Sequence, residues 1–364
     1  MIVSFAVVTL LSFCSPASSF AFLPRVSRTN DAVIIDVAGV GYAPSYQGKT
    51  LYGQITNPGF VPLPSFNPYY PMAYRQQEQT PNGFVYSYGY PTPLALEDVL
   101  PVRQTTAPVC GAGPAMPATR ALSNERISGG TSAKKGAWPF MVALKKVDGS
   151  LFCTGSLISD TRVLLAAQCL EKLSLYELST VTVLVGMFKT DQTDVQMTRR
   201  ISKIFLHSQY NSATYANDIA IIVMDAPVVL AKGVASTVCL PPASTGDDYV
   251  DQDAIILGWG APAAKTPQNL EQAKVSIISN TDCKTDADRF AGQYVTDTTI
   301  CTSVGDSVKY TCLTDVGGPV VILPSPGAWT IVGINSYTKS CSNRGLKTRV
   351  PAFRAWIDQY LTMD

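Results

Sequence analysis

The chain has 364 residues, of which 46% are hydrophobic and 15% are charged, and its 28 lysines and arginines nearly balance 27 aspartates and glutamates. This length allows one large domain or two smaller ones. The near-neutral charge lacks the basic character that binds nucleic acid or an anionic membrane, so we expect neither as a partner.

The N-terminus reads MIVSFAVVTLLSFCSPASSFA, an apolar run from Ile2 to about Cys14 followed by small residues. The run is too short to cross a bilayer and has the pattern of a secretion signal. We therefore predict a signal peptide over residues 1–19, cleaved after Ser19 or Ala21. No later segment is long and apolar enough to span a membrane, so the expected location is extracellular.

Residues 20–109 have a different composition from the rest of the chain. They include PGFVPLPSFNPYYPMAYRQQEQTPNGFVYSYGYPTP, which is rich in proline, tyrosine and asparagine. Such a stretch sustains neither helical nor strand periodicity and buries little surface, so we predict a mostly disordered or extended segment. Its simplest role is a passive spacer. Its tyrosines also suit contact with a partner or oxidative cross-linking.

From Cys110 onward, short β-rich runs recur between turn residues. They include FMVAL, VTVLVG, DIAIIVM, AIILGWG, PVVIL and TIVGINSY. Many short strands without long helical patterns predict an all-β barrel or sandwich. Only the C-terminal PAFRAWIDQYL has helical spacing, with Phe353, Trp356, Ile357 and Leu361 on one side.

The chain contains nine cysteines, and Cys14 leaves with the predicted signal. The remaining even number in a secreted chain predicts a full set of disulfides. A metal site is the alternative, but the sequence has no C-x-x-C pair and its one histidine is far from any cysteine in sequence. We therefore expect no metal and no cofactor.

A series of motifs now identifies a family. They are RISGG (126–130), WPFMVAL (138–144), CTGSLIS (153–159), LLAAQC (164–169), NDIAII (217–222), VCLP (238–241), GWG (258–260), CLTDVGGPV (312–320) and TRV (348–350). In this order they resemble the trypsin/chymotrypsin-like S1 serine proteases over nearly all of the chain from Arg126 to the C-terminus.

The resemblance implies two six-stranded antiparallel β-barrels with a cleft between them, followed by a C-terminal helix. It implies a pro-segment linker over residues 110–126 and a protease-like domain over 127–364. It also implies the disulfides Cys153–Cys169, Cys283–Cys301 and Cys312–Cys341, which leave Cys110 and Cys239 to join the pro-segment to the domain.

Two of the three catalytic positions that the resemblance implies are altered. The family uses a serine nucleophile, a histidine base and an aspartate that orients the histidine. Asp218 matches the aspartate, but Gln168 stands in place of the histidine and Val316 in place of the serine. Glutamine has no group that accepts a proton near neutral pH, and valine has no hydroxyl. The sequence therefore predicts no peptidase activity.

Neighbouring positions support this prediction. The sole histidine, His207, lies in IFLHSQY, a segment similar to a surface segment of the family, so we expect a structural role rather than that of a relocated base. The position similar to the glycine whose N–H stabilises the oxyanion is Thr314. Removing one such donor costs about 2.7–4 kcal/mol of transition-state stabilisation.

The side-chain pocket implied by the resemblance is altered as well. Its floor position resembles Tyr310, and its wall segment, usually SWG, reads NSY from Asn335 to Tyr337. The loop from Cys341 to Gly345 is shorter than usual. A tyrosine at the floor fills the pocket, so we expect it to be closed to arginine and lysine side chains.

Two features of zymogen activation are present. Arg126–Ile127 is a trypsin-like cleavage site, and Asp315 matches the residue that pairs with the new N-terminal ammonium in the family. Ser128 replaces the usual valine. The features fit either a cleavage-triggered switch or relics of ancestry.

The function that we expect is that of a secreted, non-catalytic serine protease homologue. It would regulate or assist proteases in an extracellular cascade, such as an immune cascade, and bind an active trypsin-like protease or its substrate. One alternative is a serine-type endopeptidase with a non-standard site. The other is an extracellular matrix or cuticle-associated binding protein that acts through the tyrosine-rich segment.

Overall fold

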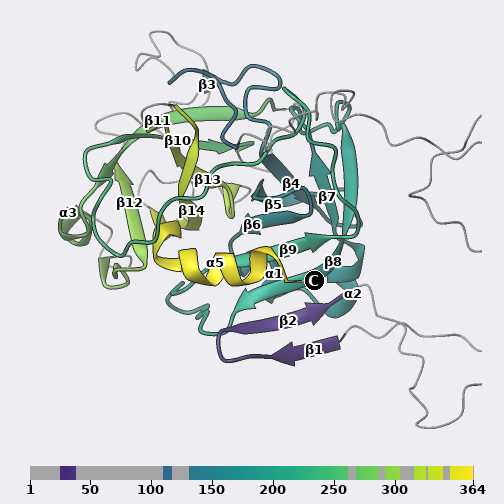
Figure 1. Cartoon of the computed structure of the whole chain (residues 1–364), viewed down its shortest axis with the longest axis horizontal. Coiled ribbons are helices and arrows are strands. Elements are labelled where there is room, and N and C mark those ends of the chain that lie inside the picture. Colours follow the sequence, from purple (N-terminus) through teal and green to yellow (C-terminus); the bar gives the residue numbers. More distant parts are fainter. Residues whose placement is uncertain are drawn as a thin grey trace, which may run out of the picture. The chain divides into compact units, whose positions relative to one another are not determined.

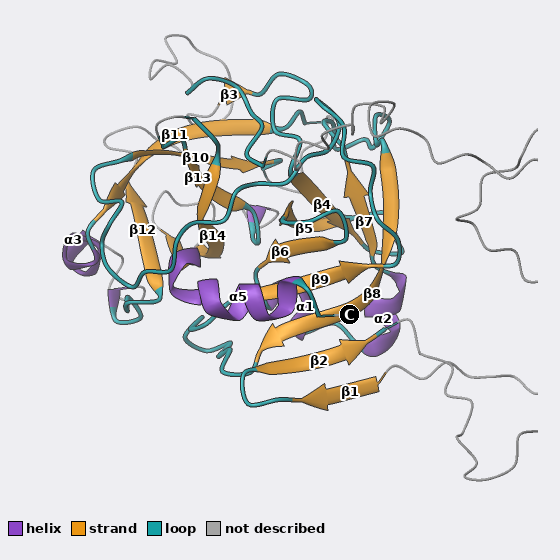
Figure 2. Ribbon diagram, viewed as in Figure 1, coloured by secondary structure: helices purple, strands orange, loops and turns teal. Residues whose placement is uncertain are grey.

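The computed structural model describes residues 25–37, 110–116, 131–260, 268–286, 292–303, 315–324, 327–338 and 345–363. All of them belong to one compact unit of the chain, which Figures 1 and 2 show. Within this described part, no helix is long and apolar enough to cross a membrane.

The first sheet closes into a barrel. Its strands are β1 (Arg25–Arg28), β2 (Ala32–Asp36), β4 (Met141–Lys145), β5 (Leu151–Leu157), β6 (Arg162–Leu165), β7 (Thr182–Val185), β8 (Met197–His207) and β9 (Ala220–Met224). They follow the order β1-β2-β8-β7-β4-β5-β6-β9. The long strand β8 also pairs with β9, so the six strands from β8 to β9 form a closed antiparallel barrel.

The second sheet closes in the same way. Its strands are β3 (Thr131–Ser132), β10 (Asp253–Gly258), β11 (Glu271–Ile278), β12 (Thr299–Ser303), β13 (Pro319–Ile322), β14 (Thr330–Thr338) and β15 (Gly345–Arg349). Their order is β10-β13-β14-β15-β12-β11-β3, and β10 pairs with β11. The two six-stranded antiparallel barrels predicted from the sequence are thus confirmed.

Helices are short in the described part of the chain. They are α1 (Gln168–Glu171), α2 (Leu175–Thr180), α3 (Asn280–Asp286), the 3-10 helix η3 (Val350–Phe353) and α5 (Arg354–Leu361). The predicted C-terminal helix is therefore present. Its buried side differs from the prediction at one position, because Tyr360 is fully buried whereas Leu361 is only partly buried.

An N-terminal hairpin adds two strands to the first barrel (Figure 1). Strand β2 pairs antiparallel with β8, from Ala32 opposite His207 to Asp36 opposite Lys203. Ala32 is fully buried and Ile35 is 7% exposed. Within the segment predicted to be mostly disordered or extended, residues 25–37 form a paired hairpin that the sequence did not single out, because AVIID buries apolar side chains and satisfies its backbone against β8.

Three disulfides join the described segments. Cys110 pairs with Cys239, Cys153 with Cys169 and Cys283 with Cys301. These are three of the four pairs that the family resemblance implies. Cys312 and Cys341 lie outside the described residues.

Candidate functional site

The site begins where the first barrel meets a short helix. Strand β6 ends at Leu165, and α1 starts at Gln168. Asp218 lies just before β9, whose residues pair with β6. The preceding Asn217 has a φ of 55°, a left-handed conformation that asparagine tolerates better than most residues. The pairing of β6 with β9 therefore brings Gln168 and Asp218 together from positions far apart in the sequence.

The Asp218 carboxylate is fully buried and accepts three hydrogen bonds. The backbone N–H of Gln168 donates to Oδ1 at 2.8 Å, and Gln168 Nε2 donates to Oδ2 at 2.6 Å. Ser336 Oγ donates to Oδ2 at 2.5 Å. Burial raises the pKa of Asp218 to about 6, and the hydrogen bonds from Ser336 and Gln168 oppose that rise.

Gln168 therefore supplies the N–H that an orienting carboxylate needs, but not a base. A neutral imidazole donates from one ring nitrogen and accepts a proton at the other. The Gln168 amide donates to Asp218 through Nε2, and its remaining polar atom is a carbonyl oxygen, which does not take up a proton near neutral pH. The hydrogen bond to Asp218 is therefore present, but Gln168 provides no group that accepts a proton.

Val316 occupies the nucleophile position as part of the apolar core. Its side chain is 5% exposed and belongs to the main hydrophobic cluster. Its carbonyl accepts a hydrogen bond from the N–H of Thr154 at 2.9 Å. The next residue, Gly317, has a φ of 85°, and a Cβ there would lie 2.3 Å from the Thr154 carbonyl oxygen. Backbone packing thus fixes the turn, while the position itself has no group that attacks a carbonyl. Thr314 lies outside the described residues.

Asp315 is buried beside the second barrel. Its Oδ1 accepts a hydrogen bond from the N–H of Gly260 at 3.0 Å, and its side chain is so close to Gly258 that a Cβ there would collide with it. Burial and the charge of Asp315 raise the pKa of Glu271 to about 7. Glu271, which lies where strand β3 joins the sheet, is therefore only partly ionised near neutral pH. Arg126 and Ile127 lie outside the described residues.

His207 lies at the end of β8, away from the Asp218 network. Its ring packs edge-on against the Phe353 ring, with a distance of 5.3 Å between the ring centroids. It also packs, in a tilted arrangement, against the Trp356 ring at a centroid distance of 5.6 Å. Its Nδ1 accepts a hydrogen bond from the N–H of Gln209 at 3.3 Å. Burial lowers the pKa of His207, which favours a neutral, packed imidazole. These contacts favour the structural role expected for it.

The residues predicted for the side-chain pocket are only partly described. Tyr310 lies outside the described residues, and Gly345 is the first residue of β15. Tyr337 packs its ring against Tyr215 at 4.8 Å. Asn335 is 2% exposed, and neither of its amide atoms has a hydrogen-bond partner.

Sequence reasoning missed the role of Ser336. The prediction treated Asn335 to Tyr337 as one wall segment, whereas the structure joins Ser336 to the buried carboxylate of Asp218. The adjacent Thr348 donates a further hydrogen bond to the Asp218 carbonyl at 2.7 Å. Aligning the serine of the SWG pattern with Ser336 would have moved the wall by one residue and identified this donor.

Comparisons with known proteins agree with this geometry. The family model described as Trypsin matches residues 127–357. One similar protein is the serine proteinase stubble of Drosophila melanogaster, which is 28% identical over 257 residues. The match covers 67% of this chain and 32% of that relative, so this chain spans about a third of the relative's length. With the family model covering most of the chain, and with both barrels closed, the chain belongs to the trypsin family.

Proposed function

We propose that this trypsin-family protein is a non-catalytic regulator that binds other proteins. The observation that carries the proposal is the pair of substitutions at the site. The buried Asp218 is hydrogen-bonded by the Gln168 amide instead of an imidazole, and the nucleophile position is the core residue Val316. A serine mechanism needs a proton acceptor and a hydroxyl together, and these two positions supply neither.

Extracellular action is part of the proposal. Three disulfides in the described segments suit an oxidising compartment, as does the apolar N-terminal run predicted to be a signal peptide. The partner would be an active trypsin-like protease or its substrate in an extracellular protease cascade, such as one in immunity. Membership of the trypsin family supports this class of partner, because proteins of this fold bind other proteins as substrates.

Regulation by cleavage between Arg126 and Ile127 completes the proposal. The buried Asp315 carboxylate carries a negative charge suited to pairing with a new N-terminal ammonium, and the same charge contributes to the raised pKa of Glu271. N-terminal sequencing of the natively secreted protein tests this step, and we expect a sequence that starts at Ile127. A secreted protein with no terminus at Ile127 would show that the cleavage site is a relic.

A serine-directed phosphonate separates the regulator from an active enzyme. We expect the purified wild-type protein to take no label and to hydrolyse no peptide ester, because Val316 offers no oxygen for the phosphorus to attach to. The matched control is the Gln168→His/Val316→Ser double variant, in which Asp218 and Ser336 remain in position. We expect this variant to take the label.

Hydrolysis by the pure wild-type protein that persists in Val316→Gly would contradict the proposal. It would favour the alternative of an endopeptidase with a non-standard site. Recovery of the protein only from an insoluble, cross-linked fraction would instead favour a matrix or cuticle role.

A further inference from the structure

Strand β15 buries two cationic side chains two residues apart. Lys347 is 3% exposed and Arg349 is 2% exposed. Lysine and arginine are seldom this deeply buried unless they are paired, because removing a charge from water is costly. The two side chains differ in whether an acidic residue among the described residues offsets the desolvation of the charge.

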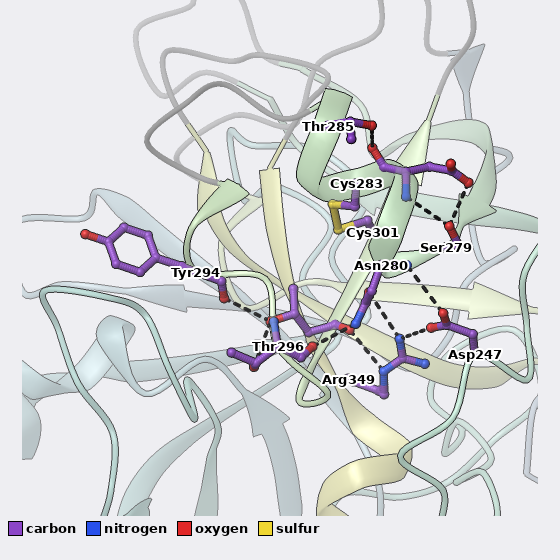
Figure 3. Close-up of a disulfide and its surroundings, with 11 residues drawn as sticks. Asp247, Ser279, Asn280, Cys283, Thr285, Tyr294, Thr296, Cys301 and Arg349 are labelled. Carbon is purple, nitrogen blue, oxygen red and sulfur yellow. Dashed lines mark hydrogen bonds and ion pairs between the residues drawn. A yellow bond between two sulfur atoms is a disulfide. The ribbon is translucent and has the colours of Figure 1, made fainter.

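Arg349 has several hydrogen-bond partners, and Figure 3 shows it beside Asp247 and Asn280, together with the Cys283–Cys301 disulfide. Its Nη2 atom donates to the Asp247 carboxylate at 2.8 Å and to Asn280 Oδ1 at 3.3 Å. Its Nε atom donates to the Thr299 carbonyl at 3.0 Å. A carboxylate therefore compensates the buried guanidinium.

Lys347 has no such carboxylate among the described residues. No ion pair joins it to an acidic side chain there, whereas Arg349, Lys203 and Lys274 each have one. Burial alone lowers the pKa of the Lys347 amine to about 8. The amine is thus a buried donor whose charge nothing in the described structure balances.

Asn335 lies directly opposite Lys347 in the antiparallel pairing of β14 with β15. Side chains of directly opposed residues lie on the same face of a sheet and are close neighbours. Asn335 is 2% exposed, and its Nδ2 and Oδ1 atoms both lack a hydrogen-bond partner. Buried carboxamides are nearly always hydrogen-bonded in native proteins, so this one is a second, independent anomaly beside the amine.

The strand on the other side of β15 supplies no side-chain partner for Lys347. On the other side of β15, the residue opposite Lys347 is the fully buried Ile300, which offers no polar atom from its side chain. A β-bulge follows Asn335 directly, between Asn335 and Thr338. Bulges are common beside binding and active sites because they redirect side chains.

The two unsatisfied amide atoms of Asn335, together with the Lys347 amine that has no ion pair among the described residues, define the chemistry of the missing partner. Lys347 Nζ and Asn335 Nδ2 are donors, and a carboxylate has two acceptor oxygens and the balancing negative charge. Asn335 Oδ1 is an acceptor and requires an N–H. A peptide that carries a carboxylate close to a backbone N–H satisfies all three atoms, as a C-terminal residue or an acidic side chain does.

We propose that Lys347 and Asn335 form a receptor for a peptide carboxylate, supplied by a partner protein's C-terminus or by one of its acidic side chains. This inference goes beyond the proposed function, because it assigns a ligand class to a face on which the sequence had predicted only a pocket wall. It is also independent of whether the chain hydrolyses peptides.

Calorimetric titration of the full-length secreted protein tests the receptor. The probes are N-acetylglycine, which has a terminal carboxylate and an N–H, and the N-methylamide of N-acetylaspartate, which has only a side-chain carboxylate. N-acetylglycine amide is the uncharged control. We expect at least one carboxylate probe to bind and the amide not to bind, and we expect Lys347→Met to weaken binding by at least about tenfold.

Matched variants separate the site from a general charge effect. Lys203→Met removes a surface lysine paired with Asp36, and we expect it to leave binding unchanged. Asn335→Val removes the carboxamide at similar size, and we expect it to weaken binding. Preference for N-acetylglycine would identify a C-terminus as the source, and preference for the aspartate probe a side chain.

The receptor would be overturned by any of three results. These are no binding of either carboxylate, equal binding of the amide, or unchanged binding by Lys347→Met whose circular dichroism matches the wild type. None of them bears on the phosphonate experiment, so failure of the receptor is distinguishable from failure of the regulator proposal.

Discussion

Replacing Lys347 by methionine is expected to raise the free energy of unfolding by about 3 kcal/mol at pH 7. The reason is that burial lowers the pKa of the amine from its ordinary 10.5 to about 8, and each pKa unit corresponds to about 1.4 kcal/mol. At pH 7 the folded protein must keep a charged amine out of water. Methionine has a similar length and no charge, so it fills the space without that cost.

The gain in stability from Lys347→Met should become smaller as the pH rises above about 8. Between about pH 8 and pH 10.5 the unfolded chain binds a proton at Lys347 that the folded protein has lost, so the wild-type protein becomes more stable as the pH rises. The advantage of Lys347→Met is therefore full below about pH 8 and shrinks above it. Urea unfolding of the wild type and of Lys347→Met, at pH 7 and at about pH 9.5, measures the difference in their free energies of unfolding at each pH.

Lys203→Met is the matched control for this measurement. Its amine forms an ion pair with Asp36 at 3.7 Å, and both side chains are about a quarter exposed. Such pairs contribute about 0–1 kcal/mol, so we expect little change in stability at either pH. A loss of stability in Lys347→Met at pH 7 would show that a counter-charge already balances the amine, and would remove the basis of the carboxylate receptor.

The N-terminal piece is expected to remain bound to the barrels after the connecting chain is cut and the Cys110–Cys239 disulfide is removed. The hairpin is fixed by more than strand pairing. Trp356 Nε1 donates to the Asp31 carbonyl at 3.0 Å, and the Tyr360 hydroxyl donates to Asp31 Oδ1 at 2.6 Å. This last bond lowers the pKa of Asp31, which keeps the carboxylate ionised as its acceptor.

The experiment uses the Cys110→Ser/Cys239→Ser variant with a site for a specific protease inserted between residues 117 and 126. After cleavage, gel filtration should show both pieces eluting together. Ile35→Asp should separate them, because it places a carboxylate at a position that is only 7% exposed, and we expect affinity to fall by at least about 100-fold.

Val26→Asp is the control for the hairpin, since Val26 is 49% exposed on the neighbouring strand. We expect this variant to retain the N-terminal piece. Separation of the pieces without any hairpin substitution would contradict the prediction, and would show that the disulfide is needed beside the hydrogen bonds that join Gly111 and Pro114 to the barrels. Retention that Ile35→Asp abolishes would show that the hairpin attaches the piece.

The amino-acid sequence by itself determined the family and the altered chemistry. The order of short motifs identified the trypsin family, and the two barrels followed from it. Gln168 and Val316 could be assigned because each stands inside a motif whose neighbours fix its position. A residue's chemical capability is local, so the absence of a titratable base and of a hydroxyl at these positions needed no coordinates.

The tertiary structure alone decided which distant residues meet. The hairpin was hidden because five residues of strand pattern lie next to a long proline-rich stretch, and their burial depends on β8, far away in the chain. Ser336 was seen as a pocket wall until the folding of β14 brought it to Asp218. Lys347 attracts no notice in the sequence and Asn335 was assigned only to a pocket wall, and the register of β14 with β15 places them side by side. The alternation of apolar residues constrains strand register, but the β-bulge after Asn335 shifts the pairing of β14 with β15, and only the folded sheet reveals that shift.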